Sequence, residues 1–231
     1  MGYYAMYYLM GIVVLPAFIF ALICQARVKS SYRKYSNVMS RSGMTGADAA
    51  YRLLQLNGIN DVRIKKISGN LTDHYDPSAK EICLSEGVFD SRSIAAIGIA
   101  CHEAGHACQH AQAYAPLTIR NIVIPATKIG STIGVPICLI GLFINSPTIA
   151  YFGIILYAFV ALFQLITLPV EFNASKRALQ TIRENNFLYD DEYNGAKSVL
   201  TAAALTYVAA LATALATLLR LLLIVNSGNR R

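Results

Sequence analysis

The sequence predicts a mainly α-helical polytopic membrane protein with about four transmembrane helices and one small α+β lobe outside the bilayer. Of the 231 residues, 55% are apolar and only 14% are charged, whereas an average globular chain has about a quarter charged residues. Charged residues are absent from three windows, 1–26, 129–170 and 198–219. Each window is long enough for a helix across the bilayer, so the sequence excludes an ordinary soluble domain.

Four hydrophobic spans fit these windows. A bilayer core about 30 Å thick needs roughly 20 apolar residues in a helix. The middle window has 42 residues, which is enough for two spans if the chain turns at Asn145-Ser146-Pro147. The predicted spans lie near 4–25, 121–144, 148–170 and 198–225.

The spans divide the chain into five segments. We interpret 1–26 as an N-terminal transmembrane anchor, 27–120 as the lobe, 121–170 as a transmembrane hairpin, 171–197 as a polar helical segment, and 198–231 as a C-terminal transmembrane helix and tail. The first segment reads as an anchor rather than a signal peptide because it has no basic n-region and is followed by basic residues.

The distribution of Lys and Arg predicts which side of the membrane each segment faces. Thirteen of the 20 lie in 27–128 and four in 171–197, while the N-terminal 26 residues and the turn at 145–148 have none. The positive-inside rule then places 27–120 and 171–197 in the cytoplasm. These juxtamembrane residues account for the net charge of +7, so no nucleic-acid partner is expected.

The lobe has signals for one amphipathic helix and two short strands. The helix runs from Thr45 to Leu56, with Thr45 or Gly46 at its start and Asn57-Gly58 at its end. Strands are predicted at 62–67 and 81–84, with a turn over Asp73 to Pro77 between them. The second strand is expected to offer its edge to an extended peptide, or else to be an ordinary edge strand.

A second helix of the lobe is predicted from Ile94 to Ala113, capped by Ser91. Its many alanines and glycines favour close packing against other helices. The five cysteines form no CxxC pair, and a disulfide framework is not expected in a cytoplasmic lobe. Cys101 and Cys108, which flank the motif described next, are expected to be small core residues.

This second helix contains the motif that carries chemistry, His-Glu-Ala-Gly-His at 102–106. Residues four apart lie about 40° apart around a helix, so His102 and His106 can direct nitrogens at one metal ion. Glu103 can then reach a water on that metal as a general base, as in zinc peptidases. Two surface histidines beside an acid are the plain alternative, but the surrounding helix is apolar, where unpaired polar groups are costly.

The third ligand has two candidates. Glu171 is the first charged residue after 42 uncharged positions and continues into a polar helix that can lie beside the histidines; the alternative is a carboxylate that reaches the lipid headgroups. His74 is the rival ligand. His110 shares the helical face, but it stands about 12 Å along the axis from His102, too far to bind the same ion.

Three segments together resemble the YugP-type membrane zinc metallopeptidases: DHYDP at 73–77, the HEAGH helix, and LPVEFNAS at 168–175. The chain is more distantly similar to the HtpX-type membrane proteases. The resemblance implies a gluzincin with a zincin-like cytoplasmic lobe, in which one zinc ion is held by His102, His106 and Glu171 and the general base is Glu103. The family pattern commonly has Asp where this chain has Asn173, and an amide orients a ligand histidine more weakly than a carboxylate.

These observations predict a membrane-embedded zinc metalloendopeptidase at the cytoplasmic membrane face. Its partners would be the lipid bilayer and a peptide or protein substrate, membrane proteins being attractive candidates. His74 is expected to stabilise the oxyanion of a tetrahedral intermediate or to organise a loop. The alternative is a non-proteolytic transporter or assembly factor, in which a fourth protein ligand, His74, would close a structural metal site.

Overall fold

The structure, a computed structural model, describes residues 11–228 of the chain. The chain divides into two compact units. Unit 1 comprises 11–24, Thr118–Leu168 and 206–228, and unit 2 comprises Gln25–Leu117 and Pro169–Leu205. Several helices supply residues to both units.

Three helices of the described chain are long and apolar enough to cross a membrane, judged by length and composition. They are α6 (Ala115–Phe143), α7 (Pro147–Glu184) and α8 (Asp190–Gly228). The helices predicted for the last three spans are confirmed, and so is the turn between α6 and α7. Each helix extends beyond its predicted span, and α7 continues without a break past Glu171 because its polar end is also helical.

The first predicted span, 4–25, lies partly outside the described residues. From Leu15 on, it belongs to α2 (Leu15–Tyr35), which is not among the three candidate spans of the described chain. A fourth span therefore stays a prediction.

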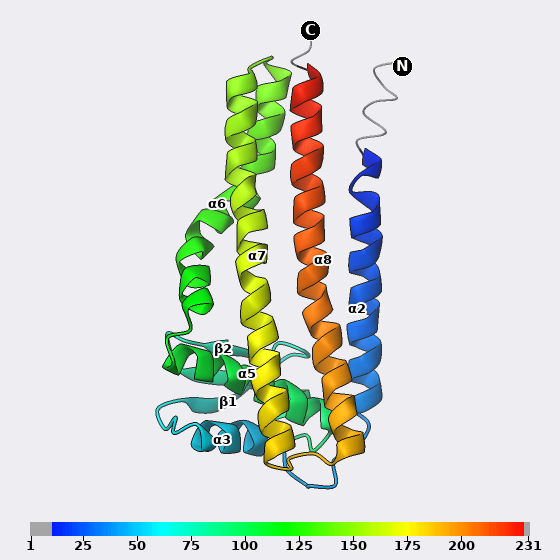
Figure 1. Ribbon diagram of the computed structural model, residues 1–231, viewed down its shortest axis with the longest axis vertical. Helices are drawn as coiled ribbons and strands as arrows, with labels where there is room; N and C mark the ends of the chain where they lie inside the picture. The colour runs from blue at the N-terminus through cyan, green and yellow to red at the C-terminus, as the bar shows by residue number, and fades with distance from the viewer. Residues whose placement is uncertain (1–10, 229–231) are drawn as a thin grey trace. The chain divides into compact units, whose positions relative to one another are not determined.

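In unit 1, glycines let α6 and α7 approach closely, as the antiparallel pair in Figure 1 shows. A Cβ on Gly153 would lie 2.3 Å from the backbone nitrogen of Cys138, and one on Gly141 would lie 2.3 Å from that of Ala150. Cys138 and Ala150 form a small core with residues of α7 and α8. Large apolar side chains such as Phe152 stay exposed on the outside, as expected for helices that face lipid.

Unit 2 contains a three-stranded sheet in the order β1-β3-β2, with β1 parallel and β2 antiparallel to β3. The strands are β1 (Arg63–Ile67), β2 (His74–Asp76) and β3 (Glu81–Ser85). The predicted turn over 73–77 is wrong in position, because 74–76 is a strand. The carboxylate of Asp73 accepts hydrogen bonds from Ser85, and Asp76 accepts from the backbone nitrogens of Ser78 and Ala79, where the chain turns. Because β3 is the central strand, its predicted free edge is also wrong.

The helices of unit 2 are largely those the sequence predicts. They are α3 (Gly46–Leu56), α4 (Glu86–Phe89), which was not predicted, and α5 (Ile94–Ala111). Thr45 caps α3 in a reciprocal capping box with Asp48, as such a pattern does. The cap of α5 is Ser93, whose hydroxyl accepts from the nitrogen of Ala96, and not Ser91. Ser91 instead donates to the Ser93 hydroxyl.

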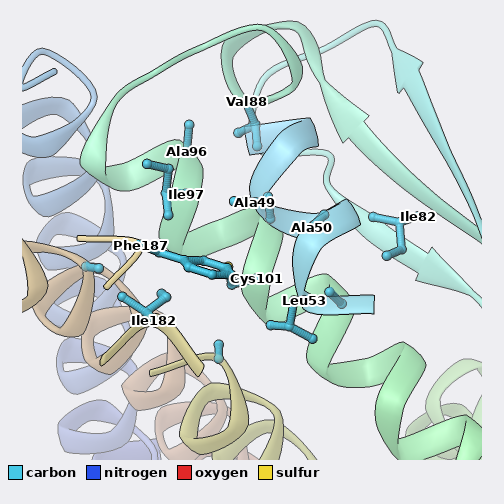
Figure 2. Close-up of a cluster of buried hydrophobic side chains, with 14 of the residues drawn as sticks. Ala49, Ala50, Leu53, Ile82, Val88, Ala96, Ile97, Cys101, Ile182 and Phe187 are labelled. Atoms are coloured by element: carbon cyan, nitrogen blue, oxygen red, sulfur yellow. The ribbon is translucent and has the colours of Figure 1, made fainter. Parts of the chain in front are cut away.

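The core of unit 2 gathers small and branched side chains from α3, β3, α4 and α5 (Figure 2). Phe187 and Ile182, from the part of the chain around the end of α7, are fully buried in the same cluster. Burying a Phe side chain contributes on the order of 2 kcal/mol. The core thereby fixes the last turns of α7 to α5, the helix that carries the histidines.

Candidate metal site

Helices α5 and α7 approach closely at the fourth residue of the HEAGH motif, Gly105. A Cβ on Gly105 would lie 2.7 Å from the carbonyl oxygen of Ala174 and 3.3 Å from its Cα. Only a residue without a side chain permits this separation. The small residues of α5 thus bring the histidine pair against the turn of α7 that contains Glu171.

Three side chains converge at this crossing. Oε2 of Glu171 lies 3.4 Å from Nε2 of His102 and 3.6 Å from Nε2 of His106, and the three ligand atoms all lie within 4.8 Å of one another. The side chains are only 14%, 12% and 5% exposed for His102, His106 and Glu171. The structure therefore brings together two imidazoles from one helix and a carboxylate from another.

The separations fit a small tetrahedral metal ion. Zinc bonds to nitrogen and oxygen ligands are about 2.0–2.2 Å long, which places neighbouring ligand atoms of a tetrahedron about 3.3–3.6 Å apart. The two distances from Glu171 match this spacing closely. His102 and His106 lie with their ring centroids 4.7 Å apart and their planes at 81°, so the two imidazoles meet edge to face rather than stacked.

The outer nitrogen of each histidine has its own partner. Nδ1 of His102 lies 3.1 Å from the hydroxyl of Ser175, and Nδ1 of His106 lies 3.0 Å from Oε1 of Gln109. When Nε2 binds a metal, Nδ1 carries the proton and donates it to such acceptors, which fixes the ring orientation. The sequence reasoning missed both partners. Their positions, four residues after Glu171 and three after His106, were the available signal.

Gln109 also joins α5 to α7. Its fully buried amide nitrogen donates to the carbonyl of Val170 at 2.7 Å and to Oδ1 of Asn173 at 3.0 Å. Asn173 in turn accepts from Nε of Arg177 at 2.7 Å. Asn173 was expected to orient a ligand histidine itself, but in the structure Gln109 stands between Asn173 and His106.

Glu103 is buried next to the pair, with 8% of its surface exposed. Burial disfavours a charged imidazole, but the carboxylates of Glu171 and Glu103 outweigh it, so the pKa of His106 lies above its ordinary value. The environment selects for positive charge at the cluster.

The remaining histidines lie outside the cluster. His74 is exposed on β2, where Nδ1 lies 2.9 Å from the carbonyl of Thr72. His110 stands at the end of α5, and its Nδ1 lies 2.7 Å from the hydroxyl of Tyr75. Burial, together with Asp61 and Asp76, raises the pKa of Tyr75 to about 12, so this hydroxyl stays protonated.

The five cysteines are all buried and free. Cys101 and Cys108 flank the histidines on α5, and both lie in the core of unit 2. Burial raises the pKa of both thiols, that of Cys108 to about 11. Neither belongs to the group of side chains that could hold a metal.

Two histidines one helical turn apart, with a carboxylate from a second helix and an acid beside the first histidine, make the donor set of a mononuclear zinc hydrolase centre. The chain belongs to the family described as "Putative neutral zinc metallopeptidase", which matches residues 10–226. It is 47% identical over 204 residues to the "Putative membrane protease YugP" of Bacillus subtilis (strain 168), covering 88% of this chain and 91% of that protein. No solved structure matches the chain.

Proposed function

We propose that this protein is a membrane-embedded zinc metalloendopeptidase of the gluzincin type, with a zincin-like lobe. One zinc ion per chain would be held by His102, His106 and Glu171. The observation that carries the proposal is the convergence of these three largely buried side chains at ligand spacing. The family and the relative named a membrane protease support it.

Each residue of the cluster has a distinct task in this proposal. Bound zinc would supply a Lewis acid that polarises the scissile carbonyl and makes a water acidic. Glu103 would take the proton of the attacking water and return it to the leaving amine. Ser175 and Gln109 would hold the imidazoles through their Nδ1 atoms. His74 would either stabilise the oxyanion or organise the loop before β2, where its Nδ1 lies near the carbonyl of Thr72.

A structural metal in a non-proteolytic protein is the competing possibility. Such a site is normally closed by a fourth protein ligand. Within residues 11–228 the group that could hold a metal comprises three side chains, and His74 is not one of them. Three protein ligands leave a position for water, which favours catalysis.

We place the site at the cytoplasmic face of a four-span protein, with peptides or membrane proteins as substrates. Glu171 directly follows the charge-free window 129–170 on one continuous helix. Sixteen Lys and Arg residues lie in 27–120 and 171–197, the segments assigned to the cytoplasm, and Lys128 lies in the first helix of the hairpin. This distribution supports the placement through the positive-inside rule.

Glu103→Gln tests the peptidase. The substitution keeps the shape of the side chain but removes the proton acceptor, so hydrolysis of a peptide library by purified protein should fall at least about a hundredfold. Zinc content, measured by mass spectrometry of the metal, should stay at the wild-type level. Glu184→Gln, at the exposed end of α7, is the matched control and should be fully active. Unchanged hydrolysis in Glu103→Gln would contradict the mechanism.

Sidedness is tested separately by cysteine labelling. The five native cysteines are buried and should contribute little labelling. A membrane-impermeant thiol reagent applied to intact cells should therefore label the variant Ser146→Cys. Ser78→Cys, next to β2, should be labelled only after the cells are lysed. The opposite pattern would place the metal site outside the cell while leaving the peptidase proposal intact.

A further inference from the structure

The C-terminal part of α2 and the N-terminal part of α8 enclose a second candidate site in unit 2, a groove of about 490 Å³. Three cations line it, Arg27, Lys34 and Lys197, and so do serine and threonine hydroxyls. No carboxylate side chain is among the lining residues. The groove shares no lining residue with the metal cluster.

The two helices run antiparallel past this groove, and two contacts fix their register. The hydroxyl oxygens of Ser31 and Ser198 lie 3.2 Å apart, and a Cβ on Gly195 would lie 2.8 Å from the ring of Tyr35. Lys34 and Lys197 therefore stand at nearly the same height, facing the same groove from different helices. Arg27 stands seven residues before Lys34, about 10 Å along the axis, at the height of Ala202.

The cations of the groove form no ion pair within residues 11–228. Among the described residues, ion pairs engage Arg41, Arg63 and several lysines, but not Arg27, Lys34 or Lys197. Lys34 lies 5.0 Å from the ring centroid of Tyr35, a cation–π contact that does not neutralise it. Gathered cations without carboxylates favour binding of an anion that accepts hydrogen bonds.

The position of these cations in the sequence indicates which kind of anion would bind in the groove. Arg27 is the first charged residue after the charge-free window 1–26, and Lys197 is the last before the charge-free window 198–219. Charged residues at such boundaries stand at the level of the lipid headgroups. The end of the groove near Arg27 also becomes apolar, where Ala202 and Leu205 line it.

We propose that this groove binds the phosphate of an anionic phospholipid headgroup. Lys34 and Lys197 would contact the phosphate together with the hydroxyls of Ser31 and Ser198, and Arg27 would meet the headgroup on its membrane side. The apolar end at Ala202 and Leu205 would adjoin the acyl chains. A soluble phosphate would gain nothing from contact with this apolar end, so we assign the site to a lipid headgroup. The inference does not rest on the peptidase activity.

Native mass spectrometry in detergent tests the site with phosphatidylglycerol and phosphatidylcholine as probes. Wild-type protein should retain phosphatidylglycerol in preference to phosphatidylcholine. In the double variant Lys34→Gln/Lys197→Gln, the preference for phosphatidylglycerol over phosphatidylcholine should fall at least about tenfold, because each juxtamembrane cation contributes appreciably to anionic lipid binding. The control Lys29→Gln/Arg33→Gln removes equal charge from the exposed part of α2 that does not line the groove, and it should keep the preference.

Two results would overturn the proposal. Equal losses in both double variants would show general surface attraction without a built site. Displacement of phosphatidylglycerol by millimolar inorganic phosphate would assign the groove to a soluble anion. Circular dichroism and zinc content should be unchanged in both variants, which separates loss of the lipid site from misfolding or loss of the metal.

Discussion

Units 1 and 2 both pack helices through small residues, but they place their polar groups differently. In unit 1, glycines bring α6 and α7 together and large apolar side chains remain outside. In unit 2, the apolar residues are gathered inside, and ion pairs such as Arg41–Asp191, Arg63–Glu81 and Lys66–Asp90 lie at its surface. Close helix packing through small residues is thus found both in a unit suited to lipid and in a unit suited to water. Unit 1 suits a lipid environment, and unit 2 keeps water-facing charge around a buried cluster of ligands.

The largest expected effect concerns the ligand that α7 contributes to unit 2. Glu171→Gln keeps the volume but replaces a carboxylate with a poor ligand, so zinc affinity should fall more than about a hundredfold, beyond the range for partners that only hold the ligands. Zinc should also no longer raise the melting temperature in detergent. Metal content measures the loss of zinc binding, and thermal melting with and without added zinc measures the loss of stabilisation.

His74→Ala is the comparison for Glu171→Gln, since both were candidates for the third ligand. It should retain zinc and its stabilising effect and change mainly turnover. Loss of metal in His74→Ala with full occupancy in Glu171→Gln would reverse the assignment. It would also mean that the α5–α7 crossing is not the metal site.

Two glycine substitutions each disturb the helix packing of one unit only. Gly105→Ala forces a Cβ against the Ala174 carbonyl and should cost about 1–3 kcal/mol of stability while also weakening zinc binding. Gly153→Ala meets the backbone of Cys138 in unit 1 and should lower the melting temperature without changing zinc affinity. Equal zinc loss in both variants would show that the metal site depends on packing in unit 1 as well.

The smallest expected effect is that of Gln109, which contacts His106, Val170 and Asn173 at once. Gln109→Met keeps a similar volume and removes these hydrogen bonds, so metal affinity or turnover should fall about 10–100-fold. Gln112→Met, at the exposed residue that follows the same helix, removes a contact to Arg177 and should change neither. Zinc titration and peptide hydrolysis distinguish them, and matching effects would deny Gln109 a role in holding the imidazole.

The features predicted correctly from the sequence are local ones. The start of the helix at Thr45 or Gly46, the turn at Asn145-Ser146-Pro147 and the long apolar helices follow from residues a few positions apart or from composition. The errors have local causes too. Ser91 and Ser93 both offer a capping hydroxyl, and the backbone angles of the chain select Ser93. A three-residue strand such as β2 is too short for an alternating pattern to reveal it.

The sequence by itself determined the class of helices and the pairing of His102 with His106, because positions four apart share a helix face whatever the rest of the chain does. The tertiary structure decided which distant residues complete the cluster. Ser175 lies 73 positions from His102, and Asn173 lies 64 from Gln109. Those contacts depend on where α5 crosses α7, which the absent side chain of Gly105 sets and no local periodicity can encode.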